Sequence, residues 1–186
     1  MIHTIIRWPA KALSSKAAPV VVFDEALKTL SSDMIETLRS HDGWGLAAPQ
    51  VGVSIRLCVV SARPDATAKT SEVLTLVNPV IVIATGEQRI VEGCLSIPDE
   101  AIRVKRALSI KVAAFDLDGK PITFEADGLG AAVLQHEIDH LDGITIADRL
   151  PFGQQKALRK KLRAAVNADV NVTVRANTIP TKTPPT

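Results

Sequence analysis

Residues 128–143, GLGAAVLQHEIDHLDG, decide how this chain folds and what chemistry it can carry. Apolar residues recur here at helical spacing, and Asp127 precedes them as an expected N-cap. His136 and His140 are four residues apart, so a helix places both imidazoles on one face, with Glu137 beside the first. Two imidazoles so placed can bind one metal ion, and the glutamate can reach a water held there. The stretch therefore predicts a metal-binding HExxH helix.

The apolar half of this helix shares a face with the polar half. Leu129, Ala132 and Val133 fall on the same stripe as the two histidines and the glutamate. A buried stripe that changes from aliphatic to polar needs partners for its polar groups, and a metal ion supplies them. The aliphatic residues would then line a pocket beside the metal. The alternative is an amphipathic helix whose histidines are ordinary polar residues.

A stable metal site needs a third protein ligand from elsewhere in the chain. The positions that carry it in HExxH proteases are not suitable here, because Ile146 follows the second histidine by six residues and 164–168 reads AAVNA. His3 and His41 lie in surroundings that do not resemble those of metal ligands. Cys94 remains, in the polar turn VEGCLSIPDE, and a thiolate binds Zn or Fe well. The alternative for Cys94 is a buried core cysteine.

Composition places the chain among globular proteins. Its 186 residues are 46% hydrophobic and 23% charged, which suits one domain with a buried core, and a net charge of +2 is too small to indicate nucleic-acid binding. Two cysteines do not make a disulfide framework, and Cys58 lies in an apolar run expected to be core. No signal peptide pattern and no apolar run of ~20 residues is found, so we expect a cytoplasmic protein.

The remaining segments predict one helix, a series of strands and a last helix. Residues 24–40 have helical spacing with Asp24 as N-cap. Among the strand-like runs that follow, Asn78-Pro79 indicates a turn between two short strands, and Asp118-Gly119 indicates a hairpin. A helix opens at Pro151.

This order of elements favours an α+β fold. We expect antiparallel or mixed β-sheets around a central HExxH helix, with an N-terminal helix and a C-terminal helix. The expected catalytic domain spans residues 1–166. Residues 167–186 have no helical pattern and end rich in Thr and Pro, which predicts a flexible tail.

Three motifs together resemble those of the peptide deformylase family. They are GWGLAAPQ at 43–50, EGCLSIP at 92–98 and QHEIDH at 135–140, in the family's order. The resemblance covers roughly residues 2–165. It implies a hydrolase that removes the N-formyl group from the initiator methionine of new polypeptides and releases formate.

The resemblance also implies roles for single residues. Cys94, His136 and His140 would be the metal ligands, and Glu137 the general acid/base. The side-chain amide of Gln50 and the backbone N–H of Leu95 would form the oxyanion hole. The implied substrate-binding residues are Trp44, Gly45, Ile90, Gly93, Leu129, Ala132 and Val133. Asp139 would orient a ligand or tie the helix to Arg106; a plain surface charge is the alternative.

The implied cofactor is one divalent ion, expected to be Fe(II), with Zn, Ni or Co as replacements in purified protein. The implied partners are N-formylmethionyl nascent peptides. The segment 154–166 is basic and would dock on the ribosome, although a solvated basic face is the common alternative. We expect neither membrane binding nor sequence-specific nucleic-acid binding.

Two positions depart from the family's usual pattern. Trp44 replaces a small aliphatic residue and could narrow the methionine pocket, and Ala101 occupies a position that often holds arginine. Two other functions compete with deformylation. A metalloprotease would need the downstream ligand that is missing, and an inactive deformylase-like protein is disfavoured by the intact Glu137 and Gln50.

Overall fold

The structure is a computed structural model that describes residues 1–62 and 72–176, with side chains up to residue 164. The chain divides into two compact units. Of the α-helices and strands that the structure describes, Met1–Arg149 contains the seven strands and two helices, and the segment from Leu150 onward contains the third helix.

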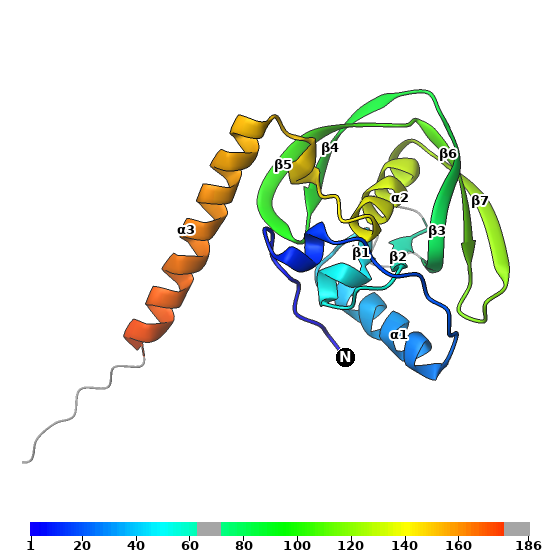
Figure 1. The fold of residues 1–186 in the computed structure, drawn as a ribbon, viewed down its shortest axis with the longest axis horizontal. Coiled ribbons are helices and arrows are strands. Elements are labelled where there is room, and N and C mark those ends of the chain that lie inside the picture. The colour runs from blue at the N-terminus through cyan, green and yellow to red at the C-terminus, as the bar shows by residue number, and fades with distance from the viewer. Residues whose placement is uncertain (63–71, 177–186) are drawn as a thin grey trace, which may run out of the picture. The chain divides into compact units, whose positions relative to one another are not determined.

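The elements of the first unit follow one another as α1, seven strands and α2 (Figure 1). Their bounds are α1 (Glu25–Ser40), β1 (Gly45–Ala47), β2 (Leu57–Ser61), β3 (Val73–Thr85), β4 (Gln88–Cys94), β5 (Ile97–Arg106), β6 (Ser109–Phe115), β7 (Pro121–Asp127) and α2 (Gly128–Leu141). Short 3-10 turns lie at Lys11–Ser14, Ala48–Val51 and Ile146–Arg149. The strands form a five-stranded antiparallel sheet of order β1-β2-β3-β6-β7 and a two-stranded antiparallel sheet, β4-β5. The predicted α+β fold is confirmed.

Strand β2 separates two hydrophobic cores because successive side chains of a strand point to opposite faces. Cys58 and Val60 pack in one core with residues of α2, including Leu134. Leu57 and Val59 pack in the other with residues of α1. Helix α2 therefore lies on one face of the large sheet and α1 on the other, as Figure 1 shows. Cys58 is fully buried, as predicted.

The expected turn at Asn78-Pro79 is wrong, because β3 continues through it. Asn78 takes a left-handed backbone conformation (φ 52°), which asparagine tolerates, and the pairing of β3 with β6 shifts register there. The Asn78 amide donates to the Val20 carbonyl (2.9 Å) and its oxygen accepts from the Val20 N–H (2.8 Å). These two bonds anchor a bulge where the dipeptide had indicated a turn.

The predicted N-caps of α1 and α2 and the predicted hairpin can be compared with the structure. Asp24 caps α1 by accepting from the Leu27 N–H at 3.0 Å, as predicted. Asp127 is the N-cap residue of α2, as predicted, but its side chain makes no capping hydrogen bond. Gly128, the first residue of α2, has a φ of 52° and donates its N–H to the Leu108 carbonyl. The hairpin between β6 and β7 is present, with Gly119 at φ 77°.

The last helix is longer than expected. Helix α3 runs from Phe152 to Ala176, so residues 167–176 are helical rather than part of a structureless tail. No Gly or Pro interrupts 167–176, and the next proline is Pro180. The rest of the expected tail, 177–186, lies outside the described residues. Within the described part of the chain, no helix is both long and apolar enough to cross a membrane.

Candidate active site

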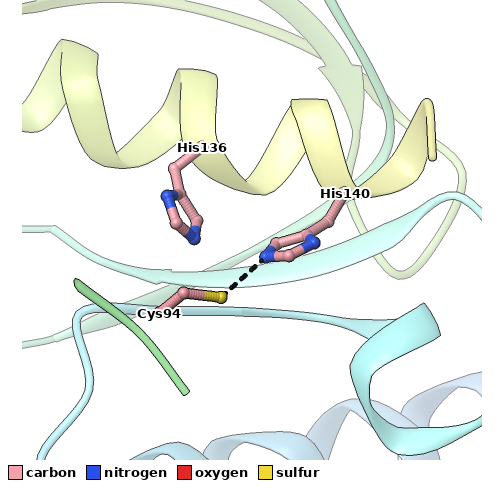
Figure 2. A group of neighbouring side chains, drawn as sticks. All are labelled: Cys94, His136 and His140. Carbon is pink, nitrogen blue, oxygen red and sulfur yellow. Dashed lines mark hydrogen bonds between the residues drawn. The ribbon is translucent and has the colours of Figure 1, made fainter. Parts of the chain in front are cut away.

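Cys94, at the end of β4, faces His136 and His140 on α2 (Figure 2). Ligand atoms of the three side chains, one from each, lie within 4.8 Å of one another, and Cys94 Sγ is 3.3 Å from His140 Nε2. The arrangement offers one sulfur and two imidazole nitrogens to a single ion. That donor set suits Zn or Fe(II) and leaves a coordination position open for a small molecule.

The burial of these groups fits a metal ion. His140 is 1% exposed, and burial lowers its pKa well below the ordinary value, which keeps the ring in the neutral form that binds metals. Burial also lowers the pKa of His136, but hydrogen bonds with Cys94 and Glu92 outweigh this and raise it well above the ordinary value. A proton and a divalent ion compete for such a nitrogen, so metal binding would release the proton.

Glu137 lies beside this group and is 3% exposed. Its Oε2 atom is buried and has no hydrogen-bond partner among the described residues. Burial raises the pKa of Glu137 to about 7. A carboxyl group of that pKa can accept and return a proton near neutral pH, and the unpartnered oxygen leaves it free to do so with a water or a substrate.

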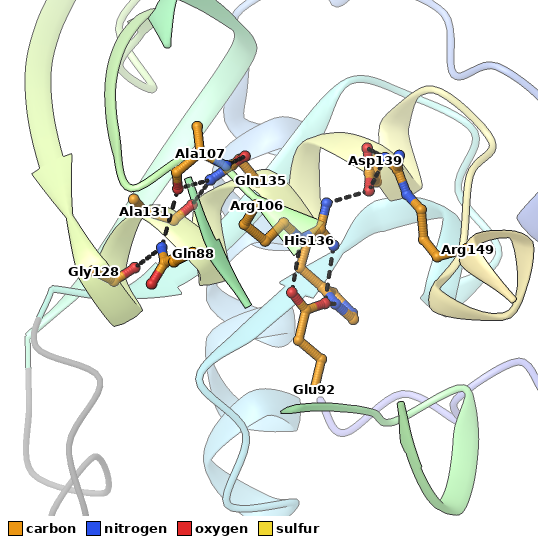
Figure 3. Close-up of polar contacts among 10 residues, drawn as sticks. All are labelled: Gln88, Glu92, Arg106, Ala107, Gly128, Ala131, Gln135, His136, Asp139 and Arg149. Carbon is orange, nitrogen blue, oxygen red and sulfur yellow. Dashed lines mark hydrogen bonds and ion pairs between the residues drawn. The ribbon is translucent and has the colours of Figure 1, made fainter. Parts of the chain in front are cut away.

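A buried carboxylate fixes the ring of His136 (Figure 3). Glu92 Oε2 lies 2.9 Å from His136 Nδ1, and Glu92 also binds Arg106 through two hydrogen bonds, at 2.7 and 2.9 Å. Burial acts to raise the pKa of Glu92, but Arg106 and His136 outweigh it and lower the pKa to about 2. An ionised carboxylate only accepts hydrogen bonds, so His136 Nδ1 must donate and its Nε2 is left for a metal.

The same arginine connects to Asp139, one turn of α2 away. Arg106 Nη1 donates to Asp139 Oδ2 at 2.5 Å, and Arg149 Nη2 donates to both oxygens of Asp139, at 2.7 and 2.8 Å. Arg106 and Asp139 were both singled out from the sequence, but Glu92 was not. A signal for Glu92 existed: it opens the EGC motif and has the same strand parity as the inward-facing Ile90.

Gln50 is buried next to Cys94, in the short turn after β1. Its Oε1 accepts from the Ala47 N–H at 2.9 Å, which fixes the orientation of the amide. The Nε2 group is then directed to Ser96 Oγ (3.2 Å) and Cys94 Sγ (3.8 Å). A donor is thus held beside the sulfur of Cys94.

Cys94, His136, Glu137 and Gln50 line one cleft of about 740 Å³, whereas His140 is not among its lining residues. Its wall includes every substrate-binding residue expected from the sequence: Trp44, Gly45, Ile90, Gly93, Leu129, Ala132 and Val133. Gln50, Leu95 and Glu137 also line it, whereas Arg106 and Asp139 do not. The volume is that of an ordinary ligand pocket, and Trp44 is one of the residues at its wall.

The sequence profile of the polypeptide deformylase family matches residues 2–156. The chain belongs to this family. Among its relatives, the peptide deformylase of Thermomicrobium roseum is 45% identical over 151 residues, which are 80% of this chain and 86% of that one. The residues matched by the family profile include the helices and the strands of the first unit, together with the residues that line the cleft.

Solved deformylase structures share the fold. The structure of a peptide deformylase from Legionella pneumophila aligns with a TM-score of 0.81 at 40% identity, covering 96% of this chain and 100% of that one. A class I type b peptide deformylase from Acinetobacter baumannii, solved with Met-Ala-Ser bound, aligns with a TM-score of 0.75 at 32% identity. That alignment covers 81% of this chain and 99% of the Acinetobacter chain.

Proposed function

We propose that this protein removes the N-formyl group from the initiator methionine of newly made polypeptides and releases formate. One observation carries the proposal: the buried carboxyl of Glu137, with a pKa of about 7, stands beside a Cys-His-His group at the wall of an apolar cleft. Hydrolysis of an amide needs an activated water, a proton carrier and a site for the oxyanion. The cleft holds residues for each of these tasks.

Cys94, His136 and His140 would hold the metal, and Glu137 would move the proton. A divalent ion at such a site supplies Lewis-acid activation of a water molecule, whose pKa it lowers towards ~7. Glu137 accepts the proton that the attacking water loses. It then donates this proton to the nitrogen of the leaving amine, which departs as the free N-terminus of methionine.

Gln50 and Leu95 would stabilise the negative charge that develops on the formyl oxygen. The Gln50 amide is already fixed by Ala47, so its N–H needs no reorientation during the reaction. The backbone N–H of Leu95, which follows Cys94, would be the second donor. Removing one donor of this kind typically lowers a rate by about 10²–10³.

The methionine side chain would lie against Leu129, Ala132 and Val133 of α2, with Ile90 opposite. Leu129, Ala132 and Val133 belong to the apolar half of the α2 stripe that continues into the metal group, whereas Ile90 comes from β4. The peptide backbone would run along Trp44 and Gly45, and Gly93 would allow it a close approach. The Met-Ala-Ser peptide in the Acinetobacter structure supports a peptide of this kind as the ligand.

Fe(II) would be the metal in the cell, because a mixed thiolate and imidazole set binds it well. The test compares anaerobic Fe(II)-loaded protein with Zn-loaded protein. We expect the iron form to be faster and to lose activity in air. Full and stable activity with Zn alone would contradict the assignment to iron.

Residues 1–166 would form the catalytic domain, working in the cytoplasm on nascent chains. The basic residues of 154–166 on α3 would dock on ribosomal RNA, an electrostatic contact that weakens with salt. Co-sedimentation with ribosomes tests this docking. It should be lost when 154–186 is removed, and unchanged co-sedimentation would remove the idea.

Formate release from formyl-Met-Ala-Ser tests the proposed reaction. Acetyl-Met-Ala-Ser is the matched substrate, because its extra methyl group should prevent attack at the metal, and formyl-Asp-Ala-Ser tests the apolar pocket. We expect rapid release from the first peptide only, with the Met-Ala bond left intact. Cleavage of the Met-Ala bond would instead favour a protease.

A further inference from the structure

A second groove, of about 740 Å³, shares no residue with the catalytic cleft. It is bordered by residues of β3, β4, β5 and α2, and five of its residues are cationic: Arg89, Arg103, Lys105, Arg106 and Arg149. Figure 3 shows Arg106 and Arg149 on either side of Asp139 at its α2 wall. So many cations around one concavity indicate an anion as its ligand.

The charges of the groove do not balance. Lys105 is paired with Glu87 at 2.5 Å, Arg149 with Asp139, and Arg106 with the buried Glu92. The other two cations, Arg89 and Arg103, are exposed, and their side chains make no ion pair or hydrogen bond with residues 1–62 or 72–164. Two positive charges are therefore left without a counter-charge. A bound dianion would neutralise both.

The uncompensated arginines are placed to act together. Arg89 lies directly opposite Lys105 in the β4-β5 pair, and Arg103 is two residues from Lys105 on the same face. Arg89 and Arg103 are thus diagonal neighbours, about 7–8 Å apart at their Cα atoms, so two long side chains can reach one anion. Like charges directly across a strand pair destabilise the sheet, and a bound anion would relieve the repulsion.

We propose that this groove binds a phosphate dianion, either free phosphate or the phosphate of a monoester. Guanidinium groups bind phosphate through paired, charge-assisted hydrogen bonds, which is why arginine suits this ligand. Ile81 and Ala84 line the same groove and give an ester's organic group an apolar surface. The lining has no aromatic side chain, so single-stranded nucleic acid would find no stacking surface there.

The test uses the full-length, Zn-loaded protein labelled with ¹⁵N. Phenyl phosphate, inorganic phosphate and sulfate are titrated above neutral pH at constant ionic strength, and the side-chain Nε–Hε signals of the arginines are followed. We expect saturable shifts for Arg89 and Arg103. Tighter binding of phenyl phosphate than of inorganic phosphate identifies a monoester, and the reverse identifies free phosphate.

Two double variants with the same change in net charge decide the location. Arg89→Gln with Arg103→Gln should weaken phosphate binding by about tenfold or more, because both guanidinium groups that would bind the anion are removed. Lys11→Gln with Lys120→Gln, two exposed residues outside the groove, should change it less than about twofold. Shifts that do not saturate, sulfate binding as tightly as phosphate, or equal weakening in both variants would overturn the proposal. None of these readouts depends on deformylase activity.

Discussion

The carboxyl group of Glu137 occupies the space in which a side chain at Gly45 would begin. A Cβ atom built on Gly45 would lie 2.3 Å from Glu137 Oε1, 2.6 Å from Cδ and 2.7 Å from Cγ. No pair of real atoms of this kind comes so close, so one of the two residues would have to move. The first motif of the chain therefore shapes the position of the proposed acid/base in the third motif.

The substitution Gly45→Ala should lower activity by displacing Glu137. We expect kcat for formyl-Met-Ala-Ser to fall by about 10²-fold, the lower end of what a misplaced general acid/base costs, with metal content unchanged. The control is Gly130→Ala on α2, where the new carbon would meet only Ala126 at 3.9 Å. Wild-type activity in Gly45→Ala would show that this contact does not position Glu137.

The substitution Glu92→Gln should weaken metal binding rather than chemistry alone. The glutamine would present an NH₂ group to donors on either Arg106 or His136, so the ring of His136 would lose its fixed orientation. We expect the dissociation constant for Zn, measured by competition with a chelator, to rise by about 10–100-fold. The control, Glu87→Gln, removes an exposed carboxylate from an ion pair with Lys105. It should leave the dissociation constant for Zn unchanged. Equal constants in both variants would contradict the account of Glu92.

The substitution Val133→Asp should prevent the methionine side chain of the substrate from binding in its pocket. A carboxylate in this apolar wall would have to be desolvated when the methionine side chain binds, so we expect kcat/KM to fall by about 10²-fold or more. Metal content, measured by elemental analysis, should not change. Val22→Asp, at a position 62% exposed, should behave as the wild type. Normal turnover by Val133→Asp would place the pocket elsewhere.

The substitution Gly143→Ala should destabilise the fold at the end of α2. Gly143 has a φ of 75°, and an added carbon would lie 2.9 Å from backbone carbons of Ser14 and Ser15, which cannot move like a side-chain end. The left-handed conformation alone costs about 1–2 kcal/mol. Gly128→Ala shares the positive φ (52°) but meets nothing within 4 Å. Denaturant unfolding should show a larger loss in the free energy of unfolding for Gly143→Ala than for Gly128→Ala. Equal losses would show that contact with the backbone of Ser14 and Ser15 does not destabilise the variant.

The helices and the metal group could be read from the sequence because each depends on local spacing. A four-residue interval fixes His136 and His140 on one face of a helix wherever that helix lies. The role of Cys94 needed more, since its approach to the histidines depends on β4 meeting α2. Cys94 was identified as a candidate metal ligand by eliminating the other possible ligands and by the three family motifs, because spacing along the chain could not reveal it.

The features that were missed depend on tertiary contacts. Asn78 was interpreted as part of a turn, but its amide binds Val20, far away in the sequence, and the strand continues as a bulge. Glu92 was overlooked because its importance comes from Arg106 and His136, which only the fold brings to it. Asp127 occupies the expected N-cap position but its side chain makes no capping hydrogen bond, and the left-handed conformation of Gly128 beside it could not be read from the spacing.

The central claim is that Glu137 moves the proton during hydrolysis of a formylated methionine. The most direct measurement is anaerobic formate release from formyl-Met-Ala-Ser by the Fe(II)-loaded protein and its Glu137→Gln variant, each with metal content determined. We expect fast release by the wild type and a loss of about 10²–10⁴-fold in the fully loaded variant. Equal release by the two proteins, or none from fully loaded wild type, would contradict the account.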